Sequence, residues 1–256
     1  MNKSIDTWNG QYYKQHSDSQ LQRGLGTIES LTLHGDEAAL DVGCGDGRIT
    51  VALAKRLPHG SVLGLDLSES MINEAKKSFG DIPNVSFVND NIITFATDKR
   101  FDLAVSFGTF HWISDQLGAF KNIFTLLKPG GRMVVKIGAE RRGGPNLFES
   151  AKWKPLLEPK GQRWFPQTPE KGQAMLEACG FTAIDVRYEE RTTTYSNQEA
   201  LFDWLMGWVP HSTGLPLEQA QEFARDMVAG AVKEQGRSEN IEQNGRAVVA
   251  IARKPV

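Results

Sequence analysis

The stretch Leu-Asp-Val-Gly-Cys-Gly-Asp-Gly, residues 40–47, has residue types that suit ligand binding. An apolar run precedes it and a helical pattern follows it, so Gly43, Gly45 and Gly47 stand where a strand turns into a helix. Glycine permits positive φ and close approach of a ligand, and a helix start offers unpaired N–H groups. Asp41 adds a carboxylate beside them. These residues predict a nucleoside-binding loop; the alternative is a glycine-rich turn that binds nothing.

The spacing of these glycines separates two classes of nucleoside. A dinucleotide site uses G-x-G-x-x-G, whose third glycine would fall at position 48, where this sequence has Arg48. The observed G-x-G-x-G after an acidic residue is typical of sulfonium nucleoside sites. The sequence therefore disfavours a pyrophosphate cradle, and a nicotinamide-dependent dehydrogenase with it.

Two further carboxylates follow the next two expected strands. Asp66 can accept both ribose hydroxyls, which supports any adenosine ligand without choosing among them. The alternative for Asp66, a charge at a helix start, is better served by Ser68 and Glu69. Asp90 can accept the adenine amino group or simply cap a loop. The other predicted cofactor contacts are Leu67, Asn91, Ser106 and Met71. For Met71 the two interpretations are packing on the adenine face and packing in the core.

His111 and Trp112 come after the fourth expected strand, where doubly wound folds place residues that contact ligands. His111 is the candidate general base for a reaction that removes a proton. The alternatives are that Trp112 fills the core and that His111 caps a turn. Tyr13, near the chain start, is a candidate to cover the cofactor, or else a packing anchor.

Short apolar runs alternate with helical patterns, which predicts a doubly wound α/β fold with a mostly parallel sheet. The expected strands are 38–42, 61–65, 85–88, 101–106, 132–137, 181–188 and 246–252. The expected helices are 48–57, 68–79, 114–127, 169–179, 198–209 and 217–235.

We expect a single domain over residues 1–256. Its parts are an N-terminal helical segment (1–37), a cofactor-binding core (38–138), a flap and helix (139–180) and a helical cap inserted between the last two strands (192–245). Large aromatics in these additions predict an apolar acceptor pocket, with packing of cap on sheet as the alternative. They are Trp153, Trp164, Phe165, Trp204 and Trp208.

Charge and composition argue against several functions. Lys+Arg 29 against Asp+Glu 31 gives a formal net charge of -2, without the basic excess that nucleic-acid binding needs. No apolar stretch suits a signal peptide or a membrane span, so we expect a cytoplasmic protein. Cys44 and Cys179 fit neither a disulfide framework nor a zinc site, and no metal is expected. We expect a monomer or a homodimer.

The motifs LDVGCGDG, LGLDLS, VND, FDLAVSFGTFHW and LLKPGG, in this order, resemble the motif series of class I S-adenosylmethionine-dependent methyltransferases. The resemblance implies a seven-stranded sheet of order 3-2-1-4-5-7-6 with S-adenosylmethionine over the carboxyl ends of the first two strands. Tyr13 with Gln20, the His111-Trp112 pair and a terminal IARK are similar to trans-aconitate and juvenile hormone acid methyltransferases, which methylate carboxylates. For Gln20 and Trp112 this implies N–H donation to the acceptor carboxylate. The alternative for Gln20 is a solvated residue on an N-terminal helix.

A carboxylate acceptor makes modest demands on the protein, because it is already ionised near neutral pH and needs no general base. A phenol or amine acceptor needs a base, for which His111 is the candidate. The sequence is also compatible with a malonyl-carrier-protein acceptor, and with a protein that binds the nucleoside without catalysis.

Overall fold

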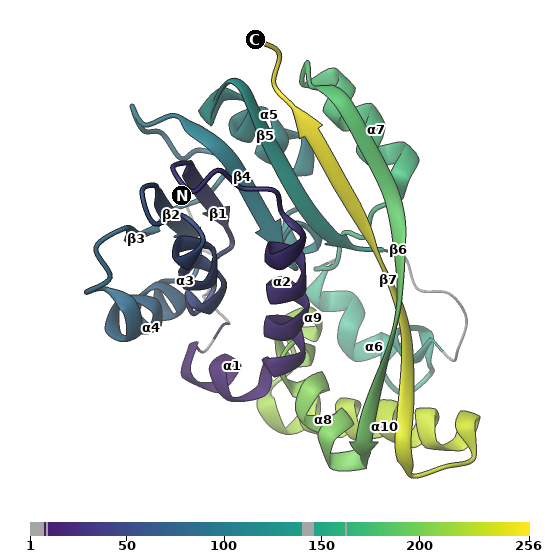
Figure 1. The fold of residues 1–256 in the computed structure, drawn as a ribbon. Coiled ribbons are helices and arrows are strands. Elements are labelled where there is room, and N and C mark those ends of the chain that lie inside the picture. Colours follow the sequence, from purple (N-terminus) through teal and green to yellow (C-terminus); the bar gives the residue numbers. More distant parts are fainter. Residues whose placement is uncertain (1–7, 9, 140–145, 162) are drawn as a thin grey trace.

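The fold is built on one twisted sheet of order β3-β2-β1-β4-β5-β7-β6 (Figure 1). It is seen in a computed structural model that describes residue 8 and residues 10–139, 146–161 and 163–256. Neighbouring strands run parallel from β3 to β5, and β7 is antiparallel to β5 and to β6. The expected fold class and strand order are confirmed. The strands are β1 (Ala38–Val42), β2 (Ser61–Asp66), β3 (Val85–Asn89), β4 (Phe101–Phe107), β5 (Leu127–Gly138), β6 (Thr182–Asn197) and β7 (Glu239–Arg253).

Capping residues fix several helix starts. Ser68 accepts a hydrogen bond from the Met71 N–H, and Asp115 accepts one from Gly118, so those helices begin beside the strands that precede them. The helices are α1 (Gly10–His16), α2 (Asp18–Ser30), α3 (Arg48–Lys55), α4 (Glu69–Phe79), α5 (Gln116–Leu126), α6 (Lys154–Leu157), α7 (Pro169–Ala178), α8 (Gln198–Met206), α9 (Val209–Thr213) and α10 (Leu217–Gln235). Short 3-10 turns lie at Phe110–Trp112, Leu147–Glu149 and Glu158–Lys160.

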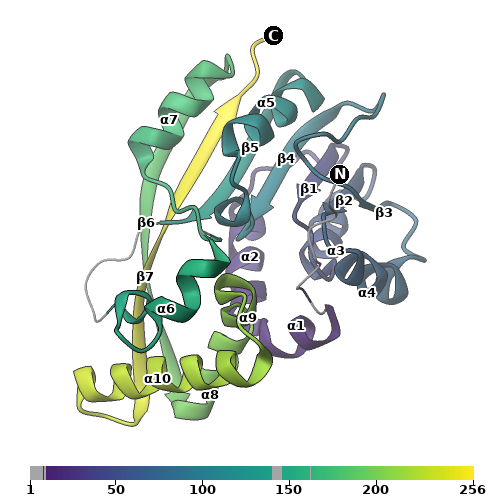
Figure 2. The same cartoon turned by 180° about the vertical axis from the view of Figure 1, so that it is seen from behind.

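The last two strands are much longer than expected. Beyond the sheet they continue as an antiparallel ribbon, from Arg191 opposite Gly245 to Asn197 opposite Glu239. Residues 192–197 and 239–245 were expected in the helical cap, and they are strands instead. Tyr195 and Ile241 lie opposite each other on this ribbon and are buried in the cap, so their burial joins the ribbon to the cap core. Helices α8 and α10 lie at the end of the ribbon that is farthest from the C-terminus (Figures 1 and 2).

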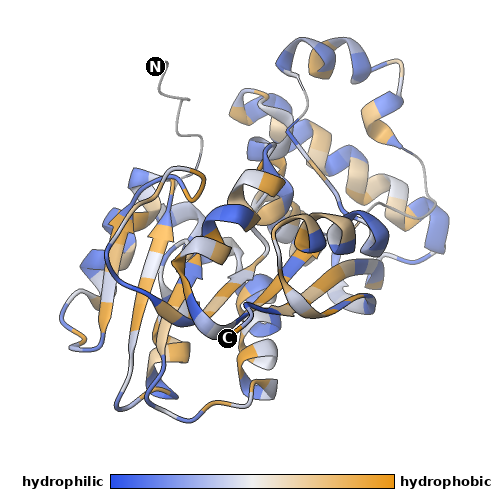
Figure 3. Cartoon of the chain, turned by 90° about the horizontal axis from the view of Figure 1, so that it is seen from above, coloured by the Kyte–Doolittle hydropathy of each residue, from blue (hydrophilic) through white to orange (hydrophobic). Residues whose placement is uncertain are grey.

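Apolar side chains lie on both faces of the sheet and in the cap. On one face the core includes Phe120 of α5 and Leu176 of α7; on the other it includes Ile28 of α2 and Leu53 of α3. A third core forms within the cap around Phe223. Figure 3 shows the strands largely in hydrophobic colours and the helices in mixed bands, as expected of strands covered on both sides. Among the described residues, no helix combines the length and apolarity of a membrane span.

Candidate functional site

The glycine loop after β1 uses its three glycines for different reasons. All have positive φ, namely 73° at Gly43, 54° at Gly45 and 84° at Gly47. A Cβ on Gly43 would lie 2.1 Å from Thr109 Oγ1, and one on Gly47 would lie 2.8 Å from the Phe87 ring, so packing excludes side chains at both. A Cβ on Gly45 would meet only the Tyr13 ring, at 3.9 Å. Gly45 is therefore the point at which the loop backbone is open to a ligand.

We expect Gly43→Ala to destabilise the fold by roughly 2–4 kcal/mol, because it combines a left-handed alanine with overpacking against Thr109. Chemical denaturation measures this loss. Gly26→Ala is the control, since nothing lies within 4 Å of its Cβ position in α2, and it should gain about 0.5–1 kcal/mol. Equal unfolding free energies for the two variants would contradict the assigned geometry.

Asp66 ties the loop to the start of α4. One carboxylate oxygen accepts the Gly45 N–H at 2.9 Å and the other accepts the Ser68 N–H at 2.8 Å. A carboxylate oxygen can accept more than one hydrogen bond, so this arrangement is compatible with ribose binding. Leu67, immediately after it, is exposed.

Asp90 and Asn91 lie beside Asp66 at the carboxyl edge of the sheet. The Asp90 N–H donates to the Asp66 carbonyl at 3.1 Å. Asp90 Oδ1 accepts the Asn91 N–H at 2.7 Å, and Asn91 Oδ1 accepts the Ile93 N–H at 3.0 Å. Both side chains therefore cap backbone N–H groups of their own loop. The predicted contact of Asp90 and Asn91 with adenine stays a prediction.

Ser106 and Met71, which were predicted to contact the cofactor, are both buried in the fold. Ser106 is fully buried, and its hydroxyl donates to the Val42 carbonyl at 2.7 Å, which ties β4 to β1. Met71 is 3% exposed, so it lies in the interior of the fold at the start of α4. Ser106 therefore joins two strands, and Met71 is a buried side chain of α4.

Tyr13 covers the glycine loop from α1. The helix is held to α4 by the Gly10 N–H, which donates to Ser70 Oγ at 3.0 Å, and by the Lys14–Glu74 ion pair at 2.9 Å. Burial raises the pKa of Tyr13 to about 12, so its phenol stays protonated. Tyr13 can therefore both anchor α1 by packing and cover a cofactor bound at the glycine loop.

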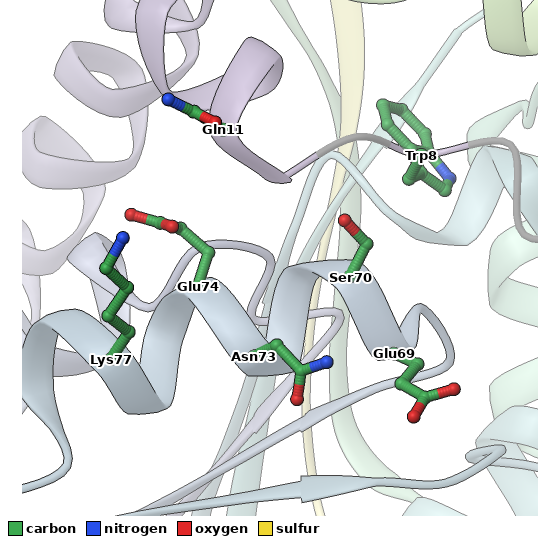
Figure 4. A pocket seen from close by; sticks show the side chains of 7 residues that line it. All are labelled: Trp8, Gln11, Glu69, Ser70, Asn73, Glu74 and Lys77. Atoms are coloured by element: carbon green, nitrogen blue, oxygen red, sulfur yellow. The ribbon is translucent and has the colours of Figure 1, made fainter.

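A shallow depression lies outside this cover, between α1 and α4 (Figure 4). It contains none of the predicted site residues, and its lining is mostly polar, so we do not assign it to the cofactor. The lining residues are Trp8, Gln11, Glu69, Ser70, Asn73, Glu74 and Lys77.

His111 is buried after β4, and its ring nitrogens have different environments. Nδ1 accepts the Gly138 N–H at 3.0 Å, so the proton of the neutral ring lies on Nε2. Burial, followed by the charges of Arg191 and His211, lowers the pKa of His111 to about 3. His111 is therefore a neutral imidazole that donates at Nε2, which does not fit the general-base interpretation.

Aromatic rings from three distant segments meet Trp112, which is half-buried rather than in the core. Its ring lies edge-on to Trp164 of the flap at 5.0 Å and to His211 of the cap at 4.7 Å. Trp8 stacks on His211 at 4.2 Å and meets Trp112 at 5.8 Å. The N-terminal segment, flap and cap thus close around the turn that holds His111.

The other expected pocket aromatics have different environments. Trp153 is buried in the cap core, where its indole N–H donates to Asp226 at 2.9 Å, so it has the packing role. Phe165 donates its backbone N–H to the His111 carbonyl at 2.8 Å. The indole N–H groups of Trp204 and Trp208 are buried without an acceptor among the described residues.

Gln20 of α2 also has a buried amide oxygen with no hydrogen-bond partner in the described part of the chain. A side chain of this kind is not simply solvated, which was the alternative for Gln20. Sequence reasoning missed Trp8 and His211 as neighbours of this region. No local motif marks them, because distant segments bring them together.

Residues 39–131 match the family model described as a methyltransferase domain. Malonyl-[acyl-carrier protein] O-methyltransferase 1 of Ilyobacter polytropus is 32% identical over 56% of this chain and 53% of its own length. Juvenile hormone acid O-methyltransferase of Bombyx mori is 28% identical over 85% of each chain. Residues 39–131 therefore form a methyltransferase domain of the class I type. The cofactor of this class is S-adenosylmethionine, which is bound in one of the similar solved structures.

Solved structures support the fold of this methyltransferase. Phosphoethanolamine N-methyltransferase 2 of Haemonchus contortus, solved with phosphomonomethylethanolamine and S-adenosylhomocysteine, has a TM-score of 0.62 at 18% identity. It matches over 93% of this chain and 53% of that chain. Among the curated relatives, this chain matches 49–53% of the length of three, which is about half of each.

Asp41 of the methyltransferase should release a proton when the cationic cofactor binds. Burial raises its pKa from 3.8 to about 7, despite the hydrogen bond from Thr50 Oγ1 at 2.7 Å. The free chain therefore loses stability as the pH rises from 3.8 through about 7, and a bound cation offsets that loss. Calorimetry near about pH 6, in buffers of different ionisation enthalpy, should detect proton release.

Asp41→Asn should abolish this release and weaken binding, whereas Asp90→Asn should leave the proton release intact. Undiminished release in Asp41→Asn would assign the titrating group elsewhere.

Proposed function

We propose that the chain transfers a methyl group from S-adenosylmethionine to the carboxylate of a small or medium-sized organic acid. The observation that carries this proposal is the state of His111. Its Nδ1 accepts the Gly138 N–H, so it offers an N–H group at Nε2 and no basic nitrogen. A carboxylate needs hydrogen-bond donors to orient it and no base to ionise it.

The glycine loop fits a cationic nucleoside. The side of Gly45 is open, and Asp41 is a buried carboxylate without a cationic partner among the described residues. Gly45, Asp41 and Asp66 are the residues proposed to hold the cofactor. When bound, S-adenosylmethionine supplies an electrophilic methyl group.

The residues around His111 are proposed to position the acceptor. His111 Nε2, the Trp112 indole and the Gln20 amide donate N–H groups to the carboxylate and aim one oxygen at the methyl group. The rings of Trp164 and His211 around Trp112 exclude water from the reacting atoms. In-line displacement gains most from this orientation and exclusion, because no proton is transferred.

A phenol or amine acceptor is disfavoured by the same observations. Either acceptor must lose a proton. His111 could take that proton only at Nδ1, which already accepts the Gly138 N–H, and the pKa of His111 is about 3. A malonyl thioester carries a carboxylate and makes no such demand, so it remains within the proposed class.

A methyl-transfer screen with a radiolabelled methyl donor tests the proposal. The panel contains organic and fatty acids, a malonyl-carrier protein, phenols and amines, and Asp66→Ala provides the blank. We expect products that release the label under mild base, as methyl esters do. A base-stable product would contradict the carboxylate acceptor. Tight S-adenosylhomocysteine binding with no turnover across the panel would indicate a binding protein.

A further inference from the structure

One arginine joins the glycine loop to the N-terminal helices. Arg48 is the first residue of α3, and its Nε donates to Asp46 Oδ2 at 2.7 Å inside the loop. Its Nη2 donates to the Ser17 hydroxyl and its Nη1 to Asp18 Oδ1 at 3.2 Å, at the junction between α1 and α2. The Asp18 carboxylate is exposed, so the buried partners Asp46 and Ser17 carry most of the connection.

Ser17 is fully buried, and its hydroxyl has an unusual partner for its position. It is the N-cap residue of α2, where a serine hydroxyl ordinarily accepts a hydrogen bond from a backbone N–H of the first turn. The Ser17 side chain makes no such capping bond, and its hydroxyl accepts from Arg48 instead. The start of α2 therefore forgoes a favourable capping contact and is tied to the arginine of the loop.

Asp46 is the second buried partner of Arg48. It is 5% exposed, and its other oxygen, Oδ1, accepts the Arg48 backbone N–H at 3.2 Å. Both carboxylate oxygens of Asp46 are thus bonded to Arg48. The preceding residue, Gly45, donates its N–H to Asp66 at 2.9 Å. The loop segment that is open to a ligand is therefore fixed by Asp66 on one side and by Arg48 on the other.

The N-terminal helices carry two residues of the candidate site. Tyr13 lies in α1, with its ring 3.9 Å from the position of a Cβ on Gly45. Gln20 lies in the first turn of α2. Ser17 stands between the two helices, so a contact that fixes Ser17 helps to place both side chains.

We propose that Arg48 is a positioning residue that couples the cofactor loop to the N-terminal helices. With Arg48 in place, a cofactor bound at Gly45 and the helices that carry Tyr13 and Gln20 stabilise each other, because each fixes the loop that the other contacts. Without Arg48, cofactor binding must also supply the free energy that orders the helices over the loop. For Gln20 this inference rests on the proposed function, which assigns its amide to the acceptor.

Arg56 provides a matched control. It follows the last turn of α3, and at the end of α2 it donates through Nη1 to the Ile28 carbonyl and through Nη2 to the Leu31 carbonyl, the latter at 3.0 Å. Arg48 and Arg56 thus join the same two helices at opposite ends, and of the two it is Arg48 that touches the glycine loop. Loss of either guanidinium should lower stability, whereas loss of Arg48 should also weaken cofactor binding.

The experiment is a double-mutant cycle on the dissociation constant for S-adenosylhomocysteine, measured by calorimetry. We expect Arg48→Gln and Ser17→Ala each to raise the constant by about 10-fold, and the double variant to raise it no further than the larger single effect. Arg48→Lys should retain part of the affinity, because an ammonium group can still pair with Asp46, and Arg56→Gln should bind as the wild type does. Multiplicative effects of the two substitutions, or an unchanged constant in Arg48→Gln, would overturn the coupling.

Hydrogen exchange gives a readout that a purely structural role would not change. In the wild type, saturating S-adenosylhomocysteine should slow amide exchange in α1 and in the first turn of α2 by about 10-fold. This added protection should be lost in saturated Arg48→Gln and kept in Arg56→Gln. Equal protection in the wild type and Arg48→Gln would overturn the inference. Neither measurement uses an acceptor, so a screen that yields no methyl ester would refute only the proposed function.

Discussion

Asp66→Ala should raise the dissociation constant for S-adenosylhomocysteine by at least about 100-fold, because the two charge-assisted bonds proposed between its carboxylate and the ribose are lost. The same change removes the acceptor of the Gly45 N–H, and so loosens the loop at the glycine that is open to the ligand. Both effects weaken binding. Isothermal titration calorimetry measures the constant directly.

Two variants separate the contributions of Asp66. Asp66→Asn keeps one carbonyl oxygen for a backbone N–H and loses the charge, so its binding should lie between wild type and Asp66→Ala. Asp90→Ala removes a neighbouring carboxylate and should cost less, because one of its oxygens is occupied by the Asn91 N–H. An unchanged constant in Asp66→Ala would show that the ribose is bound elsewhere.

His111→Phe should lower kcat/KM by about 100-fold, because it removes the N–H donor proposed to orient the substrate carboxylate and leaves the Gly138 N–H without a hydrogen-bond acceptor. His111→Gln should retain more activity, since an amide can accept from Gly138 with its oxygen and donate with its nitrogen. His59→Phe, at an exposed position, is the control and should behave as wild type.

The pH dependence provides a second test of His111. Its pKa of about 3 lies below the ordinary value of 6.5, so the folded chain should lose stability as the pH falls through 6.5 toward 3. Activity should show no inflection near 6.5 from this residue. Nitrogen NMR should find the proton on Nε2. A His111 proton on Nδ1, or a titration near 6.5, would restore the general-base interpretation.

The parts of the fold that were predicted correctly have strong local patterns. Strand 38–42 and helix start Ser68 were identified because a buried apolar run and a capping serine are readable over a few residues. The outer half of β6 was not, because its sequence Arg-Thr-Thr-Thr-Tyr-Ser-Asn is polar. Its strand conformation depends on pairing with residues 239–245, nearly fifty positions later.

In the candidate site too, the sequence predicted the features that a local motif marks and missed those that depend on distant segments. The glycine loop and Asp66 come from two contiguous motifs, so spacing alone located them. The tautomer of His111 depends on a backbone N–H of β5, and the neighbours of Trp112 come from the flap and the cap. Such features depend on tertiary contacts, for which a single sequence carries no periodic signal.

The β6–β7 ribbon has a consequence for how this enzyme class diversifies. Chain enters the cap at Asn197 and leaves it at Glu239, and these two residues are paired neighbours. The segment between them therefore has adjacent ends, so its exchange leaves the register of the sheet intact, provided that the new segment packs against Trp153 and the ribbon as the present one does. The residues proposed for the cofactor lie outside that segment, so one nucleoside site can serve a succession of different acceptor lids.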